Sequence, residues 1–162
     1  MQKEDYRFTF EVYESIDELA EADARLLNEA RKATQHAYAP YSHFRVGAIA
    51  LLNNDKTVAG SNQENASFPL GLCAERVMLA STVSLYPNVP IKTLAISYNN
   101  ENGDNNHPIS PCGICRQSLL EYETKLKQPI RIILGGLQGK VYIIERAAML
   151  LPLSFSADEL ST

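Results

Sequence analysis

The spacing of apolar and polar residues predicts a strand and a long helix in the first part of the chain. Apolar and polar residues alternate over residues 8–12, which is typical of a short strand. Residues 15–18, Ser-Ile-Asp-Glu, have the form of a capping box, and apolar residues recur after them at helical spacing. We therefore predict a helix from this box to about Ala37, ended before Pro40.

Strands and helices alternate through the rest of the chain. The predicted helices cover residues 73–86 and 112–126, and the predicted strands cover residues 44–52, 57–61, 91–98, 130–134 and 141–145. Only residues 135–139 separate the last two strands, and so short a loop permits an antiparallel hairpin but no helical crossover. The pattern predicts the α/β class: a three-layer α/β/α sandwich with a mixed five-stranded sheet whose last two strands form that hairpin.

The length, charge and apolar runs of the chain predict one domain and argue against nucleic acid and membranes as partners. The 162 residues are expected to form a single domain, residues 1–162. The 15 Lys and Arg against 19 Asp and Glu leave a formal charge of −4, which argues against nucleic acid as a partner. No apolar run approaches the roughly 18 residues of a membrane span, and no apolar signal segment follows Met1. We predict a cytoplasmic protein with no membrane partner.

The three cysteines are the strongest chemical signal in the chain. They occur in Cys73-Ala74-Glu75 and in Pro111-Cys112-Gly113-Ile114-Cys115, and both segments open predicted helices. Helix N-termini stabilise negative charge, and thiols three residues apart on one turn can converge on one ion. Three protein ligands leave the fourth position of Zn²⁺ open to water, which is the pattern of a catalytic zinc site.

Neighbouring residues fit such a site, while other interpretations of the cysteines stay open. Glu75 stands at the same helix start and can take a proton from a water beside the metal. Arg76 is a candidate to offset the negative charge of three thiolates by donating to a ligand sulfur. Cys112 and Cys115 also fit a redox pair, or a structural zinc closed by one of the histidines His36, His43 and His107.

Five segments of the chain carry a resemblance to a known family. They are Tyr41-Ser42-His43-Phe44-Arg45-Val46-Gly47-Ala48, Asn62-Gln63-Glu64-Asn65-Ala66, Cys73-Ala74-Glu75-Arg76, Pro111-Cys112-Gly113-Ile114-Cys115-Arg116-Gln117 and Leu150-Leu151-Pro152-Leu153-Ser154-Phe155. Together and in this order they resemble the cytidine deaminases, specifically the small type that acts on free nucleosides. The resemblance runs from about Leu26 to Leu160 and implies a cytidine-deaminase-like fold.

The resemblance implies a zinc-dependent hydrolase with one Zn²⁺ per chain, held by Cys73, Cys112 and Cys115. It implies that an activated water attacks C4 of cytosine and that Glu75 carries the protons. Cytidine and deoxycytidine would become uridine and deoxyuridine plus ammonia, a reaction of pyrimidine salvage. Backbone groups near Ala74 would contact the edge of the base.

The resemblance also assigns residues to the substrate and to the assembly. Asn62 and Glu64 match the ribose-binding pair, and residues i and i+2 of an extended segment point the same way. The backbone of Gln63 would run along the ligand, and Phe44 would pack on the sugar or the base. Phe155 would reach the active site of a neighbouring subunit, which implies a homotetramer, with a homodimer as the alternative.

Two segments depart from the family pattern, and two rival functions remain. Residues 1–25 form an N-terminal extension with a short strand and the helix start, and the polar loop of residues 99–106 is longer than is typical. One rival is deamination of another cytosine-bearing small molecule, such as a nucleoside antibiotic. The other is a non-catalytic, zinc-stabilised binding module, which would need neither Glu75 nor an open metal position.

Overall fold

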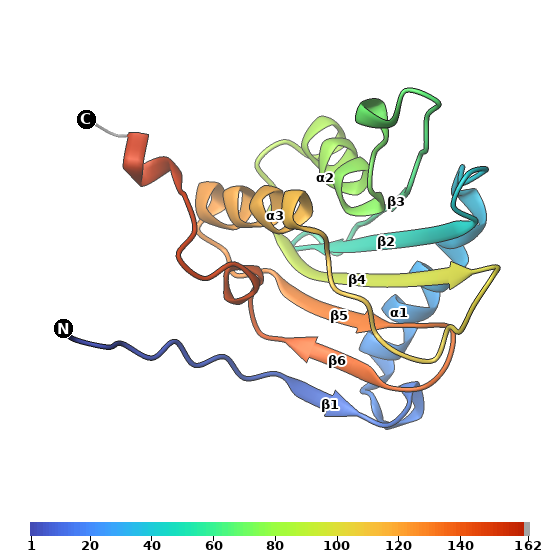
Figure 1. Ribbon diagram of the computed structural model, residues 1–162, viewed down its shortest axis with the longest axis horizontal. Helices are drawn as coiled ribbons and strands as arrows, with labels where there is room; N and C mark the ends of the chain where they lie inside the picture. The colour runs from blue at the N-terminus through green and yellow to red at the C-terminus, as the bar shows by residue number, and fades with distance from the viewer. Residues whose placement is uncertain (161–162) are drawn as a thin grey trace.

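A six-stranded mixed sheet with helices on both faces forms the body of the computed structural model, which describes residues 1–160 (Figure 1). In sheet order the strands are β1 (Glu11–Tyr13), β6 (Val141–Ile144), β5 (Arg131–Gly135), β4 (Ile91–Asn100), β2 (Phe44–Leu52) and β3 (Thr57–Ser61). Strands β4 and β5 run parallel, and every other neighbouring pair is antiparallel. Within these residues no helix is long and apolar enough to cross a bilayer.

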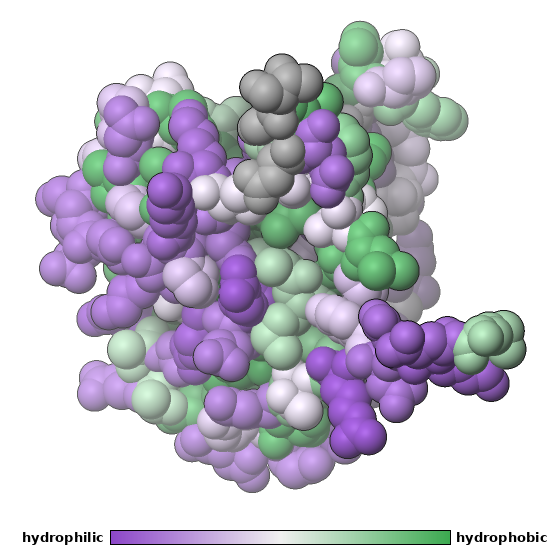
Figure 2. Space-filling model, turned by 90° about the vertical axis from the view of Figure 1, so that its left-hand side faces the viewer, coloured by the Kyte–Doolittle hydropathy of each residue, from purple (hydrophilic) through white to green (hydrophobic). Residues whose placement is uncertain are grey.

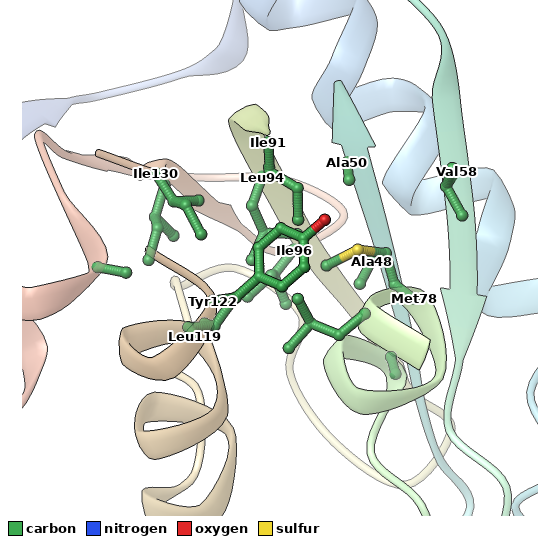
Figure 3. Close-up of a cluster of buried hydrophobic side chains, with 14 of the residues drawn as sticks. Ala48, Ala50, Val58, Met78, Ile91, Leu94, Ile96, Leu119, Tyr122 and Ile130 are labelled. Atoms are coloured by element: carbon green, nitrogen blue, oxygen red, sulfur yellow. The ribbon is translucent and has the colours of Figure 1, made fainter. Parts of the chain in front are cut away.

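Three helices cover the two faces of this sheet. Helix α1 (Glu21–Ala33) lies on one face, and α2 (Ala74–Leu85) and α3 (Gly113–Leu126) lie on the other (Figure 1). The face under α1 buries Leu27 and Ala30 against the sheet. On the opposite face, Met78 of α2 and Leu119 of α3 pack over the centre of the sheet (Figure 3). The apolar stripe of each helix therefore fixes its position over the strands.

The prediction of five strands is wrong, because the N-terminal extension adds a sixth. Strand β1 pairs antiparallel with β6, with Val12 opposite Tyr142. Without β1, the outer edge of β6 would present unpaired backbone groups, and the alternating segment of the extension covers them. The strand begins at Glu11 rather than at Phe8.

The first helix begins later than predicted. Ser15 accepts a hydrogen bond from the backbone N–H of Asp17 at 3.2 Å, and Glu18 accepts one from the N–H of Glu14 at 2.9 Å. These bonds cap a short 3₁₀ turn, Ile16–Glu18, and extended backbone at Leu19 ends it. Helix α1 starts only at Glu21, because a capping pattern fixes where a turn begins but not how far it continues. The other predicted elements are confirmed to within two residues at each end.

The N-terminal extension also forms a groove with the C-terminal segment. The ring of Phe8 stacks on that of Phe10 with centroids 5.4 Å apart. The ring centroids of Phe10 and Tyr142 are 4.9 Å apart. These rings line a groove of about 550 Å³ together with Met149 and Leu150. Figure 2 shows apolar surface between the two terminal segments. The extension therefore contributes an aromatic surface as well as an edge strand.

A buried carboxylate ties the end of α3 to the strand and turn beside it. Glu123 is 3% exposed, and its Oε1 accepts two hydrogen bonds from the guanidinium of Arg146, at 2.8 and 3.0 Å. Its Oε2 accepts from the backbone N–H groups of Ile130 and Ala147, at 3.0 and 2.9 Å. Four donors thus compensate the cost of burying this charge.

We predict that Glu123→Gln lowers the free energy of unfolding by about 2–3 kcal/mol. The amide keeps the shape of the side chain but loses its charge and turns one acceptor into a donor facing an N–H group. Denaturant titration measures the change. Glu121→Gln, at an exposed position of the same helix, is the control and is expected to change stability by less than about 0.5 kcal/mol. Equal stability of the two variants would contradict the role assigned to Glu123.

Candidate active site

Two helix N-termini bring the three cysteines together over one face of the sheet. Cys73 is the N-cap of α2, Cys112 is the N-cap of α3, and Cys115 lies in the first turn of α3. Strand β3 sets the start of α2, since a Cβ on Gly60 would lie only 2.4 Å from the carbonyl oxygen of Ala74. A residue with a side chain at position 60 would push the helix and its cysteine away from the strand.

The sulfur atoms have the spacing that a tetrahedral zinc ion requires. The Sγ of Cys112 lies 3.7 Å from the Sγ of Cys73 and 3.5 Å from the Sγ of Cys115. All three lie within 4.8 Å of one another, and no other residue among 1–160 joins this potential metal-binding group. Zn–S bonds of about 2.3 Å in a tetrahedron place two sulfurs about 3.8 Å apart. The three thiols therefore fit one Zn²⁺, and no histidine takes a fourth position within the described chain.

The same geometry makes the thiol of Cys73 the most acidic part of this group. A hydrogen bond from the Cys115 thiol, with a second from Cys112 and the nearby charge of Arg76, lowers the pKa of Cys73 to about 6. The hydrogen bond to Cys73 and burial raise the pKa of Cys115, because Cys115 is the proton donor of the pair. One thiolate is thus formed easily, and a cation at the centre would favour the others.

Glu75 is a buried carboxyl group beside the sulfurs. It is 5% exposed, and no ion pair within residues 1–160 involves it. Burial raises the pKa of Glu75 above its usual range, and the negative charge of Cys73 acts in the same direction. A carboxyl group tuned in this way is suited to accepting and returning a proton near neutral pH.

A cavity of about 360 Å³ opens in front of these groups. Its wall contains Glu75, two of the cysteines, Cys73 and Cys112, and all five predicted substrate-binding residues: Phe44, Asn62, Gln63, Glu64 and Ala74. Ala74 follows the helix N-cap, where backbone N–H groups have no acceptor within the helix. The cavity thus combines an apolar wall, backbone N–H groups at a helix start and a buried acid.

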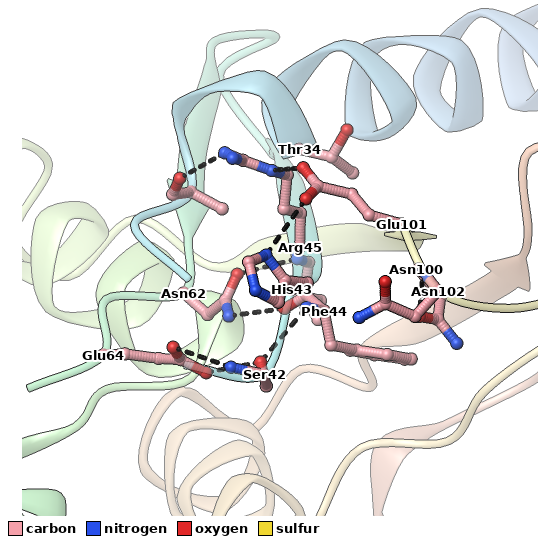
Figure 4. Close-up of polar contacts among 12 residues, drawn as sticks. Thr34, Ser42, His43, Phe44, Arg45, Asn62, Glu64, Asn100, Glu101 and Asn102 are labelled. Atoms are coloured by element: carbon pink, nitrogen blue, oxygen red, sulfur yellow. Dashed lines mark hydrogen bonds and ion pairs between the residues drawn. The ribbon is translucent and has the colours of Figure 1, made fainter. Parts of the chain in front are cut away.

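Asn62 is held by the start of β2, and Glu64 is held by the segment that precedes it (Figure 4). Asn62 donates to the carbonyl of Phe44 at 2.9 Å and accepts from the N–H of Val46 at 2.7 Å. Glu64 accepts from the N–H of Tyr41 at 2.9 Å and from the Ser42 hydroxyl at 2.5 Å. Burial opposes ionisation, but these hydrogen bonds keep the pKa of Glu64 below its usual range. Both side chains are therefore fixed in place at the cavity wall.

Comparisons with known proteins give one consistent result. Residues 20–127 match the family model of the cytidine and deoxycytidylate deaminase zinc-binding region. The cytidine deaminase of Halalkalibacterium halodurans is 35% identical over 84% of this chain and 96% of its own length. That of Sporosarcina psychrophila is 38% identical over 85% of this chain and 93% of its own. The crystal structure of cytidine deaminase from Burkholderia pseudomallei superposes with a TM-score of 0.71 at 35% identity, covering 85% of this chain and 100% of that one.

The chain belongs to the cytidine deaminase family. The family match covers the segments that carry Cys73, Glu75, Cys112 and Cys115. A zinc-binding region is thus matched where the structure gathers three thiols with the spacing of zinc ligands.

Gln63 contributes to the cavity wall without its side chain, and Arg76 and Phe155 lie outside the wall. The side chain of Gln63 turns away and donates to the Ser61 hydroxyl at 3.2 Å, which leaves its backbone beside the cavity. The charge of Arg76 lowers the pKa of Cys73, but no hydrogen bond within residues 1–160 joins its guanidinium to a sulfur. Phe155 does not line the cavity of its own chain and is 59% exposed.

The sequence did not identify five wall residues of this cytidine deaminase site, Val46, Gly71, Leu72, Ile109 and Ser110, or Tyr98 behind the wall. Ile109 and Ser110 line the cavity from the irregular segment before α3. Their position could have identified Ile109 and Ser110 in the sequence, because they directly precede Pro111 and the predicted metal ligand Cys112. Tyr98 lies behind Phe44 with nearly parallel rings 5.1 Å apart, and its position in a buried strand gave no sign of this contact.

Proposed function

We propose that this chain hydrolyses cytidine and deoxycytidine to uridine and deoxyuridine, releasing ammonia. The observation that carries the proposal is the buried carboxyl group of Glu75 in one cavity with the thiols Cys73 and Cys112. A purely structural zinc module would have no use for a buried acid there. A Zn²⁺ ion held by Cys73, Cys112 and Cys115 would supply a water of lowered pKa. We further infer that residues 1–162 act as one domain, and a cytoplasmic location remains a prediction.

Glu75 carries the protons of the reaction. Deamination replaces the exocyclic amine at C4 with the oxygen of a water molecule. Glu75 accepts one proton from that water and delivers it to N3, where uridine retains it. It then takes the remaining proton of the oxygen to the amine, which leaves as ammonia. Its raised pKa suits this role, because the group must be both base and acid within one turnover.

The other wall residues bind and orient the nucleoside. The backbone N–H at the start of α2, near Ala74, is placed to donate to the pyrimidine edge. Asn62 retains one N–H and one lone pair after its bonds to β2, and Glu64 is ionised, so the pair can bind the sugar hydroxyls. Phe44 provides an apolar surface for the base or the sugar. An ordinary ribose is thus favoured over a modified sugar.

Arg76 is proposed to offset the excess charge of three thiolates on a divalent ion. Its effect on the pKa of Cys73 supports an electrostatic action through space rather than a direct bond to sulfur. Arg76 would therefore affect how tightly the zinc ion is held and how strong a Lewis acid it is. Arg76→Gln with unchanged turnover and zinc affinity would reject this role.

Glu75→Gln is predicted to lower kcat at least roughly 10³-fold while zinc remains bound. The amide fills the same space but cannot carry a proton. Loss of absorbance on conversion of cytidine to uridine measures turnover, and atomic absorption measures zinc per chain. Glu121→Gln is the control, since it makes the same change at an exposed position of α3. Comparable turnover of the two variants would contradict the mechanism.

We also propose a homotetramer in which Phe155 enters the site of a neighbouring subunit, with a homodimer as the alternative. The exposed ring of Phe155 and the fully exposed Leu153 beside it support an apolar contact with another chain. Active protein is expected to sediment as four chains of 18.0 kDa. Phe155→Ala is expected to weaken turnover roughly tenfold, whereas Phe8→Ala, also an exposed phenylalanine, is expected to leave it unchanged. A fully active monomer would contradict both parts of this proposal.

A further inference from the structure

Three aromatic rings form a continuous stack from the cavity wall to the protein surface. Phe44 lines the cavity, and the ring of Tyr98 lies against it with centroids 5.1 Å apart and planes at 11°. Tyr98 also contacts the ring of His107, with centroids 5.8 Å apart and planes at 59°. Tyr98 is 1% exposed in β4, whereas His107 is exposed in the segment that leads to α3.

The hydroxyl group of Tyr98 ties this stack to the loop that follows β4. It donates to the carbonyl oxygen of Asp104 at 3.3 Å and lies 3.3 Å from Nδ1 of His107. Two and three residues after His107 come Ile109 and Ser110, which line the cavity. Tyr98 thus contacts one cavity wall directly and holds the segment that carries another wall.

The loop itself is a rigid unit rather than a loose connection. The side chain of Asn105 accepts from the N–H of Asn100 at 2.6 Å and donates to its carbonyl at 3.1 Å (Figure 4 shows Asn100). The carbonyl of Asn105 accepts from the N–H of Gln138 in the β5–β6 turn at 3.2 Å. Gly139 has a φ of +77°, and a Cβ there would lie 2.0 Å from the carbonyl of Asn106. The loop is therefore fixed at both ends and seated on a turn that only glycine permits.

We propose that Tyr98 is a positioning residue that holds Phe44 and the Ile109–Ser110 segment in place for nucleoside binding, with His107 as its outer support. This inference rests on the proposed function of the cavity. Tyr98 lies outside the cavity wall, so it acts through the residues it touches. Without the contacts of Tyr98, Phe44 and the loop segment would sample more conformations. Ordering them on binding would then reduce the affinity for the substrate.

The proposal assigns the effect to binding rather than to chemistry. Neither the thiols nor Glu75 contact the stack through any hydrogen bond or ring contact within residues 1–160. When an interaction stabilises the bound substrate and the transition state equally, its removal raises KM and leaves kcat unchanged. A residue with a purely structural role would lower stability without changing KM in this way.

The test compares Tyr98→Phe, Tyr98→Leu and His107→Ala with Tyr122→Phe. Tyr122 is a matched control, because its hydroxyl also donates to a backbone carbonyl, that of Val89, at 3.1 Å, and it lies outside the cavity. Cytidine kinetics, zinc content and thermal midpoints are measured for each. We expect KM to rise about fivefold for Tyr98→Phe and roughly tenfold or more for Tyr98→Leu, with kcat within about twofold.

Two results would overturn the proposal while the wild-type protein deaminates cytidine. One is an unchanged KM for Tyr98→Phe and His107→Ala, with stability changes like those of Tyr122→Phe. The other is a fall in kcat at constant KM. His107 is exposed, so His107→Ala carries the test even if Tyr98→Leu fails to fold. Absence of cytidine turnover by the wild-type protein would instead refute the proposed function itself.

Discussion

The convergence of two helix N-termini on one face of the sheet is the constraint on which the site depends. Helices α2 and α3 pack on the same face, and their starts place three sulfurs within 4.8 Å of one another. Each helix dipole favours negative charge at that end, so the thiolates sit where the backbone already compensates them. The close approach at Gly60 keeps α2 against β3 and thereby fixes half of this arrangement.

The site also balances a crowded set of negative groups. Cys73 and Glu75 are neighbours on one turn, and the charge of Cys73 raises the pKa of Glu75. A divalent cation among the sulfurs would relieve this repulsion, and the charge of Arg76 contributes in the same direction. Glu64, by contrast, is kept ionised by hydrogen bonds from the segment before β2. The cavity wall therefore combines a buried acid of raised pKa with a hydrogen-bonded anion.

The sequence was informative where chemistry is local and less so where it depends on distant contacts. The spacing of Cys112 and Cys115, and of Cys73 and Glu75, identified groups that the structure brings together, because each pair lies on a single helical turn. The sixth strand was not counted in the sheet, since pairing of β1 with β6 joins segments far apart in the sequence. The same limit hid Tyr98, whose role depends on rings from two other segments. The helix start at Glu21 was missed because the apolar residues keep their helical spacing through Leu19, although the backbone there is extended.

The proposed reaction requires one metal ion held by the sulfurs of Cys73, Cys112 and Cys115, with a fourth position open to water. X-ray absorption at the zinc edge of the purified protein tests it most directly. We expect one zinc per chain with three sulfur neighbours at about 2.3 Å and one lighter oxygen neighbour. A first shell completed by a histidine nitrogen or by a fourth sulfur, or a protein that binds no zinc, would contradict it.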